Sequence, residues 1–305
     1  MERVQRNSRS TPDAGPGPWF AQRRSAIDAE LSDHLNALKS RVDPNCDLLD
    51  CVQYALLSGG KRLRPMLVLE ACRACGGDES RAMPAALAVE CVHAFSLVHD
   101  DLPAMDDDDL RRGRPTCHKA FGEAQAILAG DWLIAHAFEL LGGASDADTK
   151  SEMVAALATG TASMVIGQSA DIAGERKPPD AERVRFIHAH KTASLFETAC
   201  TLGALAAEAP GAARQSLREY GRRCGLAFQI ADDILDRTAA TDDMGKRTAK
   251  DDVASKQTFP AVFGLEASRA HARDEVHAAL ASLDAFDQRA DRLRALARII
   301  LTRVH

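Results

Sequence analysis

Apolar residues recur at helical spacing from about residue 25 to the end of the chain. Ala, Leu, Glu and Arg dominate this stretch, and no part of it shows the apolar/polar alternation and β-branched enrichment typical of strands. Breaks that contain Gly or Pro separate segments of roughly ten to over twenty residues, long enough to bury apolar stripes against several neighbours. The pattern predicts an all-α fold.

The first residues lack both this helical rhythm and the apolar core of a signal peptide. We expect residues 1–24 to be a disordered amino-terminal arm that ends near Trp19, and residues 25–305 to be a single all-helical domain. The 305 residues and 46% hydrophobic content suffice for one large core. Because no run of about 18 apolar residues exists, we expect no stable membrane insertion.

Composition narrows the possible partners and the compartment. The net charge of −6 argues against nucleic acid, because phosphate backbones are held by surplus Lys and Arg. The eight cysteines lack the dense spacing of a secreted disulfide framework, so we expect buried thiols in a reducing cytoplasm. Cys72 and Cys75 form a CxxC pair, but no second pair or matching His pair accompanies them, which favours buried thiols over a zinc or redox site.

Two acidic clusters, residues 100–109 and 232–236, lie beside strongly apolar helical sequence. Most acidic runs are solvated surface faces, and Asp108 and Asp109 fit that interpretation. Unpaired carboxylates next to apolar residues are costly, however, and are usually tolerated because a cation neutralises them. The clusters therefore indicate two opposing carboxylate walls that hold divalent ions and a highly anionic substrate.

Helical geometry specifies the second cluster further. Asp232 and Asp236 lie one turn apart on one face, which Gln229 joins, while Asp233 points about 100° away. In the first cluster, Pro103 disfavours continuation of the helix, so the chain must bulge, which lets Asp100 and Asp106 approach one site from different backbone segments. Oxygen ligands without His or Cys indicate a hard ion such as Mg²⁺.

Two basic segments, residues 59–65 and 110–116, accompany the acidic clusters. Their charges could form surface salt bridges, which contribute little to stability. Metal-bound phosphate, however, also needs guanidinium donors, whose fork matches phosphate oxygens. A basic helix start at residues 61–64 is electrostatically unfavourable on its own, so we expect an anionic ligand there.

Taken together, these motifs resemble the short-chain trans-prenyl diphosphate synthases, particularly the bacterial farnesyl diphosphate synthases. The resemblance rests on GGKRLRP at residue 59, HDDLPAMDDDDLRRGRP at residue 99, HKT at residue 190, FQIADDILD at residue 228, and Gly245-Lys246 with Lys256 beyond, and it covers roughly residues 25–305. It implies an isoprenoid-synthase-type helical bundle around a deep central cavity, and a homodimer.

The resemblance also assigns roles to individual residues. It implies about three Mg²⁺ ions per site, with Mn²⁺ as a possible substitute, bound by Asp100 and Asp106 with Asp101 assisting and by Asp232 with Asp233 and Asp236 nearby. It places the allylic diphosphate at Arg111, Lys191, Thr192, Gln229 and Lys246. It places isopentenyl diphosphate at Lys61, Arg64, His93 and Arg112, with Gly60 and Lys256 as further substrate-binding residues.

The expected reaction is metal-assisted ionisation of the allylic diphosphate, attack by the alkene of isopentenyl diphosphate, and loss of a proton to the departing diphosphate. Phe95 and Ser96 precede Asp100 by five and four residues. In the resembling family an aromatic at the first position blocks elongation near C15. Phe95 therefore favours farnesyl diphosphate, with geranylgeranyl diphosphate as the alternative.

Two departures from the family pattern, Ile166 and Trp132, are expected to narrow or reshape the cavity. Two other classes remain open. A terpene cyclase shares the helical architecture but typically lacks the second acidic motif and the GGKRLRP segment. A non-catalytic subunit of a heteromeric prenyl synthase generally loses motif aspartates, and this chain keeps them all.

Overall fold

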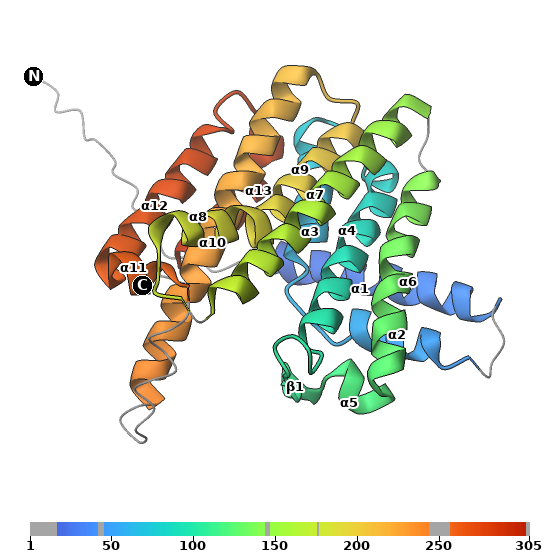
Figure 1. The fold of residues 1–305 in the computed structure, drawn as a ribbon. Coiled ribbons are helices and arrows are strands. Elements are labelled where there is room, and N and C mark those ends of the chain that lie inside the picture. Colours follow the sequence, from blue (N-terminus) through green and yellow to red (C-terminus); the bar gives the residue numbers. More distant parts are fainter. Residues whose placement is uncertain (1–16, 42–45, 144–146, 176, 244–256, 303–305) are drawn as a thin grey trace, which may run out of the picture.

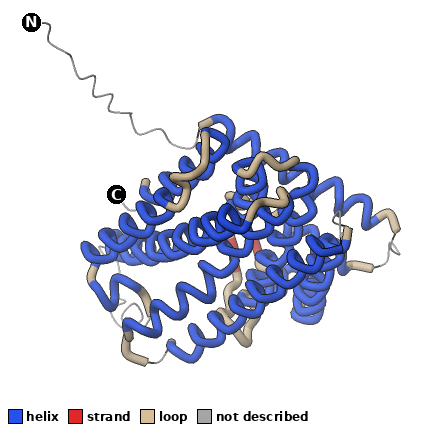
Figure 2. Tube along the Cα trace, turned by 90° about the horizontal axis from the view of Figure 1, so that it is seen from above, coloured by secondary structure: helices blue, strands red, loops and turns tan. Residues whose placement is uncertain are grey.

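The computed structural model describes residues 17–41, 46–143, 147–175, 177–243 and 257–302, without the side chains of 239–243. Helices dominate these ranges, as predicted, and the only described strands form one short hairpin (Figures 1 and 2). The elements are α1 Pro18–Lys39, α2 Leu48–Leu56, α3 Leu63–Ala74, α4 Glu79–Asp100, β1 Leu110–Arg111, β2 Arg114–Pro115, α5 Cys117–Phe121, α6 Glu123–Gly142, α7 Ala147–Gly174, α8 Ala181–Ile187, a π-helix His188–Ala193, α9 Ser194–Ala206, α10 Gly211–Asp243, α11 Phe259–Phe263, α12 Leu265–Ala281, a 3₁₀-helix Gln288–Ala290 and α13 Asp291–Leu301.

The centre of the bundle consists of α3, α4 and α9. These helices are apolar on nearly all sides, which is why the other helices surround them. In Figure 1, α1, α2 and α6 cover one side of this centre, and α10, α12 and α13 cover the other. Gly203 lets α9 approach α3 closely, because a Cβ there would lie 2.1 Å from the carbonyl oxygen of Val68.

The structured region starts earlier than the expected boundary at residue 25. Helix α1 begins at Pro18, and a proline is well suited to a first helical turn because its missing N–H has no intrahelical acceptor there. The side chains of Trp19 and Phe20 pack against the core. Residues 18–24 therefore belong to the bundle, while residues 1–16 lie outside the described ranges.

Two helices, α4 and α7, are long and apolar enough to cross a membrane by length and composition, which the sequence prediction did not recognise. A core helix passes the same test, and the apolar window of α4 is 67% buried in the bundle. The corresponding window of α7 is only 39% buried. None of the eight cysteines forms a disulfide; Cys46 is exposed, and the others are buried or half-buried.

Candidate active site

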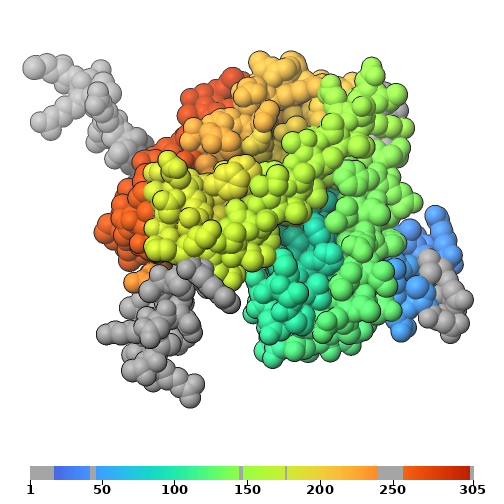
Figure 3. Space-filling view, viewed as in Figure 1, coloured from blue at the N-terminus to red at the C-terminus, as the bar shows by residue number. Residues whose placement is uncertain are grey.

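A cavity of about 700 Å³ opens between α4, α7, the π-helix and α10. In Figure 3 the surface is hollowed between the yellow-green atoms of α7 and the teal atoms at the end of α4. The cavity brings together residues from both acidic clusters and both basic segments, which are far apart in the sequence. The predicted site residues that line it are Arg64, His93, Phe95, Ser96, Asp100, Arg111, Arg112, Lys191, Thr192, Gln229 and Asp232.

The first acidic wall is the carboxyl end of α4. Asp100 is its last residue, and the chain then folds back as Pro103 predicted, so that the backbone N–H of Asp106 donates to the carbonyl of Asp100 (2.8 Å). Burial, together with the charge of Asp106, raises the pKa of Asp100 to about 6, although Lys191 opposes the shift. Burial also raises the pKa of Asp106. Concentrated negative charge at this wall is therefore poorly compensated by the protein alone.

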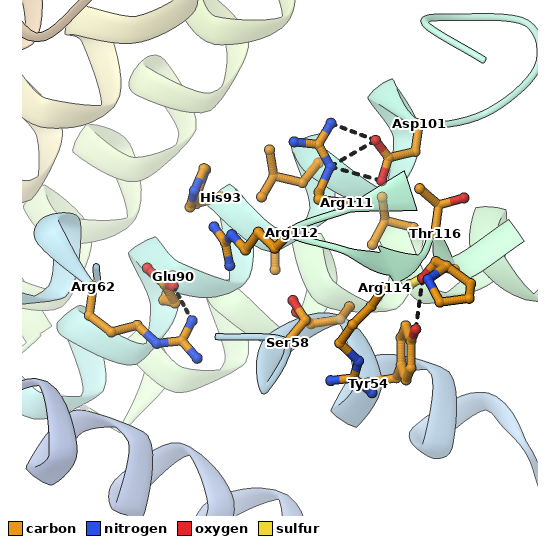
Figure 4. A pocket seen from close by; sticks show the side chains of 16 residues that line it. Tyr54, Ser58, Arg62, Glu90, His93, Asp101, Arg111, Arg112, Arg114 and Thr116 are labelled. Carbon is orange, nitrogen blue, oxygen red and sulfur yellow. Dashed lines mark hydrogen bonds and ion pairs between the residues drawn. The ribbon is translucent and has the colours of Figure 1, made fainter. Parts of the chain in front are cut away.

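Asp101 points away from the large cavity. Its buried carboxylate accepts two hydrogen bonds from Nε of Arg111, at 2.8 and 2.9 Å, and one from Nη2 at 2.5 Å (Figure 4). Arg111 comes from the β1–β2 hairpin and lines the large cavity as well as a small pocket behind the hairpin. Asp101 therefore orients a cation of the site and does not face the cavity itself.

The second acidic wall belongs to α10. Asp232 lines the cavity, whereas Asp233 is 6% exposed and accepts hydrogen bonds from the interior at both carboxylate oxygens. Asp236 is exposed and does not line the cavity. Asp233, a predicted neighbour of the metal ligands, therefore faces the core and not the cavity, in keeping with its predicted offset from Asp232.

Lys191 and Thr192 lie on the π-helix His188–Ala193. Insertions of this kind occur often at functional sites. Gly167 on α7 permits the close packing, since a Cβ there would lie 2.1 Å from the backbone nitrogen of Lys191. The Lys191 ammonium pairs with Asp171 at 2.6 Å, and although burial lowers the pKa of Lys191, Asp171, Asp100 and Asp106 raise it above its usual value. Lys191 is thus a fixed cation facing the first acidic wall.

A second cavity of about 370 Å³ adjoins the first and shares Arg64, His93, Arg112 and Phe228 with it. All the residues predicted for isopentenyl diphosphate, apart from Lys256, line this cavity: Gly60, Lys61, Arg64, His93 and Arg112. Lys246 and Lys256 lie outside the described residues, so their roles stay predictions.

Burial and crowded positive charge shape the second cavity. Arg64 is half-buried, its Nε has no partner among the described residues, and burial lowers its pKa to about 10. Burial and the neighbouring arginines, Arg64 first, hold the pKa of His93 well below its usual value, so His93 is neutral. Arg112 donates to the carbonyl of Gly59, and a Cβ at Gly60 (φ +135°) would lie 2.9 Å from its guanidinium. The cavity is therefore built for an anion.

Arg62, between Lys61 and Arg64, also lines the second cavity, but its charge is already paired. Its backbone is left-handed (φ 53°), and its guanidinium pairs with Glu90 at 2.5 Å (Figure 4). It also pairs with Asp28 at 2.7 Å. Arg62 thus fixes the start of α3, and two carboxylates offset its charge.

Two residues of the site were missed by sequence reasoning. Asp171 follows Gln168 by one helical turn, and both lie on α7. Gln168 is 9% exposed and lines the large cavity, and both its amide atoms lack partners among the described residues. The available signal was a Gln and an Asp spaced i,i+3 within an otherwise apolar helix.

Ile166 and Trp132, the two departures from the family pattern, lie outside the lining of the large cavity. Ile166 is 53% exposed, and Trp132 stacks on His136 with ring centroids 4.3 Å apart.

The helical bundle, with acidic walls on two helices facing one cavity, defines the class of prenyl-transferring synthases. Residues 46–298 match the polyprenyl synthetase family, and the chain belongs to this family. It is a prenyltransferase that condenses isopentenyl diphosphate with allylic diphosphates.

Curated relatives and solved structures agree with this assignment. The chain is 47% identical over 264 residues to geranylgeranyl pyrophosphate synthase 11 of Arabidopsis thaliana, covering 83% of this chain and 74% of the relative. It is 47% identical over 295 residues to geranylgeranyl pyrophosphate synthase 9 of the same plant, covering 93% and 81%. An FPP/GFPP synthase from Zymomonas mobilis superposes with a TM-score of 0.79 at 37% identity, covering 92% of this chain and 99% of that one.

Proposed function

We propose that this prenyltransferase is a magnesium-dependent geranylgeranyl diphosphate synthase. The observation that carries the mechanism is that Asp100 and Asp232, from opposite acidic walls, line one cavity. The product assignment is supported by the relatives, which are named geranylgeranyl synthases at 45–49% identity.

The residues present fit Mg²⁺. The donors at both walls are oxygens, and the raised pKa of Asp100 reflects burial and negative charge that a cation would relieve. In the described ranges, no group of three His, Cys, Asp or Glu side chains is arranged to bind a metal ion by itself. Mg²⁺ does not require such a group, because it is commonly held by one or two carboxylates together with substrate phosphates. We propose Asp100, Asp106 and Asp232 as the ligands, with about three ions per site and Mn²⁺ as a substitute.

The bound ions supply charge neutralisation for the leaving diphosphate. Lys191 and Arg111 add donors on the same side of the cavity, each held in place by a carboxylate: Asp171 for Lys191 and Asp101 for Arg111. Fixed donors of this kind stabilise developing negative charge without reorganisation during the reaction. Thr192 and Gln229 complete the proposed allylic site.

Isopentenyl diphosphate is proposed to occupy the second cavity, with its diphosphate on Lys61, Arg64 and Arg112. Because four residues line both cavities, an isopentenyl diphosphate bound in this way would hold its alkene next to the ionising carbon. A neutral His93 can donate one hydrogen bond to a phosphate oxygen without adding to the positive charge. We propose that the departing diphosphate accepts the proton lost after condensation.

Farnesyl diphosphate is a second candidate product because of Phe95. This residue lines the cavity on the α4 wall, 7% exposed, and its ring contacts His99 edge-on at 5.1 Å. A ring fixed here limits the depth available to a growing chain. The cavity volume falls within the usual range for small-ligand sites and does not by itself distinguish the two products.

Product sizing tests the proposal. The purified protein is incubated with Mg²⁺, isopentenyl diphosphate and dimethylallyl, geranyl or farnesyl diphosphate, and the dephosphorylated alcohols are separated by chain length. Geranylgeraniol as the main alcohol, formed also from farnesyl diphosphate, supports the C20 assignment. Farnesol as the end product, with farnesyl diphosphate unused as a primer, would replace it by the C15 assignment.

We also propose a homodimer. Large apolar side chains are exposed on α6 and α7, among them Ile127 (45%), Leu128 (52%) and Ile166 (53%). A second copy of the chain would remove this apolar surface from water. Light scattering at micromolar concentration tests the proposal: a monomeric mass would contradict it.

A further inference from the structure

A chain of three hydrogen bonds and one histidine–carboxylate contact runs from the wall of the large cavity into the core. The hydroxyl of Thr192 donates to Oε1 of Gln229 at 2.6 Å, and Nε2 of Gln229 donates to Oδ1 of Asp233 at 3.0 Å. At the other carboxylate oxygen, Asp233 accepts from the backbone N–H of Phe259 at 2.9 Å and lies 3.0 Å from Nε2 of His188. Asp233 and His188 are 6% and 2% exposed, and neither lines the cavity.

The chemistry of Asp233 sets the direction of these bonds. An ionised carboxylate only accepts hydrogen bonds, so the amide nitrogen of Gln229 must face it. The amide oxygen of Gln229 must then face Thr192, and the Thr192 hydroxyl donates its single hydrogen to that oxygen. Consequently Thr192 presents its oxygen to the cavity as an acceptor, and the Gln229 amide cannot flip without losing two bonds.

The inner end of the chain is held from three elements. Asp233 comes from α10, His188 opens the π-helix, and Phe259 is the first residue of α11. The His188 ring stacks on the Phe259 ring, with centroids 5.0 Å apart and planes 25° apart. A buried carboxylate held by two hydrogen bonds and a histidine contact resists reorientation, because a lost hydrogen bond to a charged group would leave that charge uncompensated in the core.

We propose that Asp233 and His188 are positioning residues for the ionisation step. They act through Gln229 and Thr192, fixing oxygen acceptors toward the allylic carbon on which positive charge develops. Acceptors oriented in advance stabilise that charge without reorganisation. The inference rests on the proposed placement of the allylic substrate at Thr192 and Gln229.

Two conservative substitutions break the chain from its inner end. Asp233→Asn removes the carboxylate at nearly constant shape, and His188→Phe keeps the stack on Phe259 but removes the ring nitrogen that contacts the carboxylate. Each is expected to lower kcat about tenfold to a hundredfold, with KM for isopentenyl diphosphate and the Mg²⁺ requirement within about twofold of the wild type. His271→Phe is the matched control, because His271 contacts the same Phe259 ring edge-on at 5.6 Å but makes no hydrogen bond or ion pair to Asp233 in the described part of the chain.

A double-mutant cycle separates positioning from a general structural role. In a Thr192→Val background the substitution at His188 should lose most of its effect on kcat, because the acceptor it orients is gone. Full additivity of the two effects, or wild-type kcat in both Asp233→Asn and His188→Phe, would overturn the inference. Thermal unfolding of each variant gives the folded fraction, and if Asp233→Asn does not fold, the His188→Phe cycle decides alone.

The single Thr192→Val variant distinguishes this inference from the underlying site assignment. Wild-type kcat and allylic KM in that variant would show that the allylic substrate lies elsewhere. Impaired turnover in Thr192→Val, combined with unimpaired His188→Phe and Asp233→Asn, would leave the site assignment in place and reject the positioning role.

Discussion

In each acidic wall, one aspartate faces the cavity and the next one is buried, but the two buried aspartates have different binding partners. Asp100 and Asp232 line the cavity, while the residues after them, Asp101 and Asp233, turn into the protein. Asp101 binds the guanidinium of Arg111, a cation that itself lines the cavity. Asp233 binds an amide, a backbone N–H and an imidazole. The first wall therefore arranges charge, and the second arranges hydrogen-bond orientation.

The backbone explains this difference. Wall one is the end of a helix followed by a folded-back loop, so a hairpin arginine can reach Asp101 from outside the helix. The second acidic wall lies within the long helix α10, so the partners of Asp233 come from the elements that pack against this helix. A pair of adjacent aspartates thus supplies one carboxylate that faces the cavity and one that anchors a neighbouring group, because consecutive helical residues point about 100° apart.

The largest expected effect is at the two cavity-facing aspartates. Asp100→Ala and Asp232→Ala should each lower kcat by at least about a thousandfold, because each removes a proposed ligand of the ions that neutralise the leaving group. Circular dichroism and thermal unfolding should stay near wild type. Near-normal turnover in both variants would refute the facing-wall mechanism.

Next in size is the anchor of the first wall. Asp101→Asn should raise KM for the allylic diphosphate about tenfold or more, because Arg111 loses a bidentate partner at 2.5–2.9 Å. By contrast, Asp233→Asn should act on kcat. Asp109→Asn is the control, since Asp109 is an exposed residue of the same loop that pairs only with Lys119 among its described salt bridges. If Asp101→Asn and Asp233→Asn changed the same kinetic constant, the two acidic walls would not differ in function.

Asp171→Asn should have a smaller effect, lowering kcat/KM for the allylic substrate about tenfold. Lys191 keeps its charge but loses a partner at 2.6 Å, so its ammonium is less well fixed toward the first wall. Glu175→Gln, at an exposed position just beyond α7, serves as the control. Unchanged kinetics in Asp171→Asn would show that Asp100 and Asp106 alone place Lys191.

The smallest expected change in rate, with a qualitative change in product, is at Phe95. Phe95→Ala should leave kcat within about threefold and shift the alcohols toward longer chains, because truncating the ring deepens the cavity beside α4. Chromatography of the dephosphorylated products measures the shift. An unchanged chain-length distribution would mean that Phe95 is ordinary core.

Much of the site could be predicted because its signals are local. Helical spacing places Asp232 and Gln229 on one face and Asp233 on another, and Pro103 forces the loop that returns Asp106 to Asp100. The roles of Asp171 and His188 depend instead on which helices meet in the bundle. Sequence spacing cannot show that Lys191 would reach across to α7, or that α11 would cap Asp233.

The π-helix at residues 188–193 has an evolutionary consequence. A π turn holds one residue more than the α-helical turn it replaces. Deleting any single residue between His188 and Ala193 would replace that turn by a regular α-helical turn, so the helices on either side would stay in register. Val184 and Leu195 would then stay in the core, and only the residues of the turn itself would be repositioned. A shortened segment could thus keep the bundle folded, but the turn that presents Lys191 and Thr192 to the cavity would be lost.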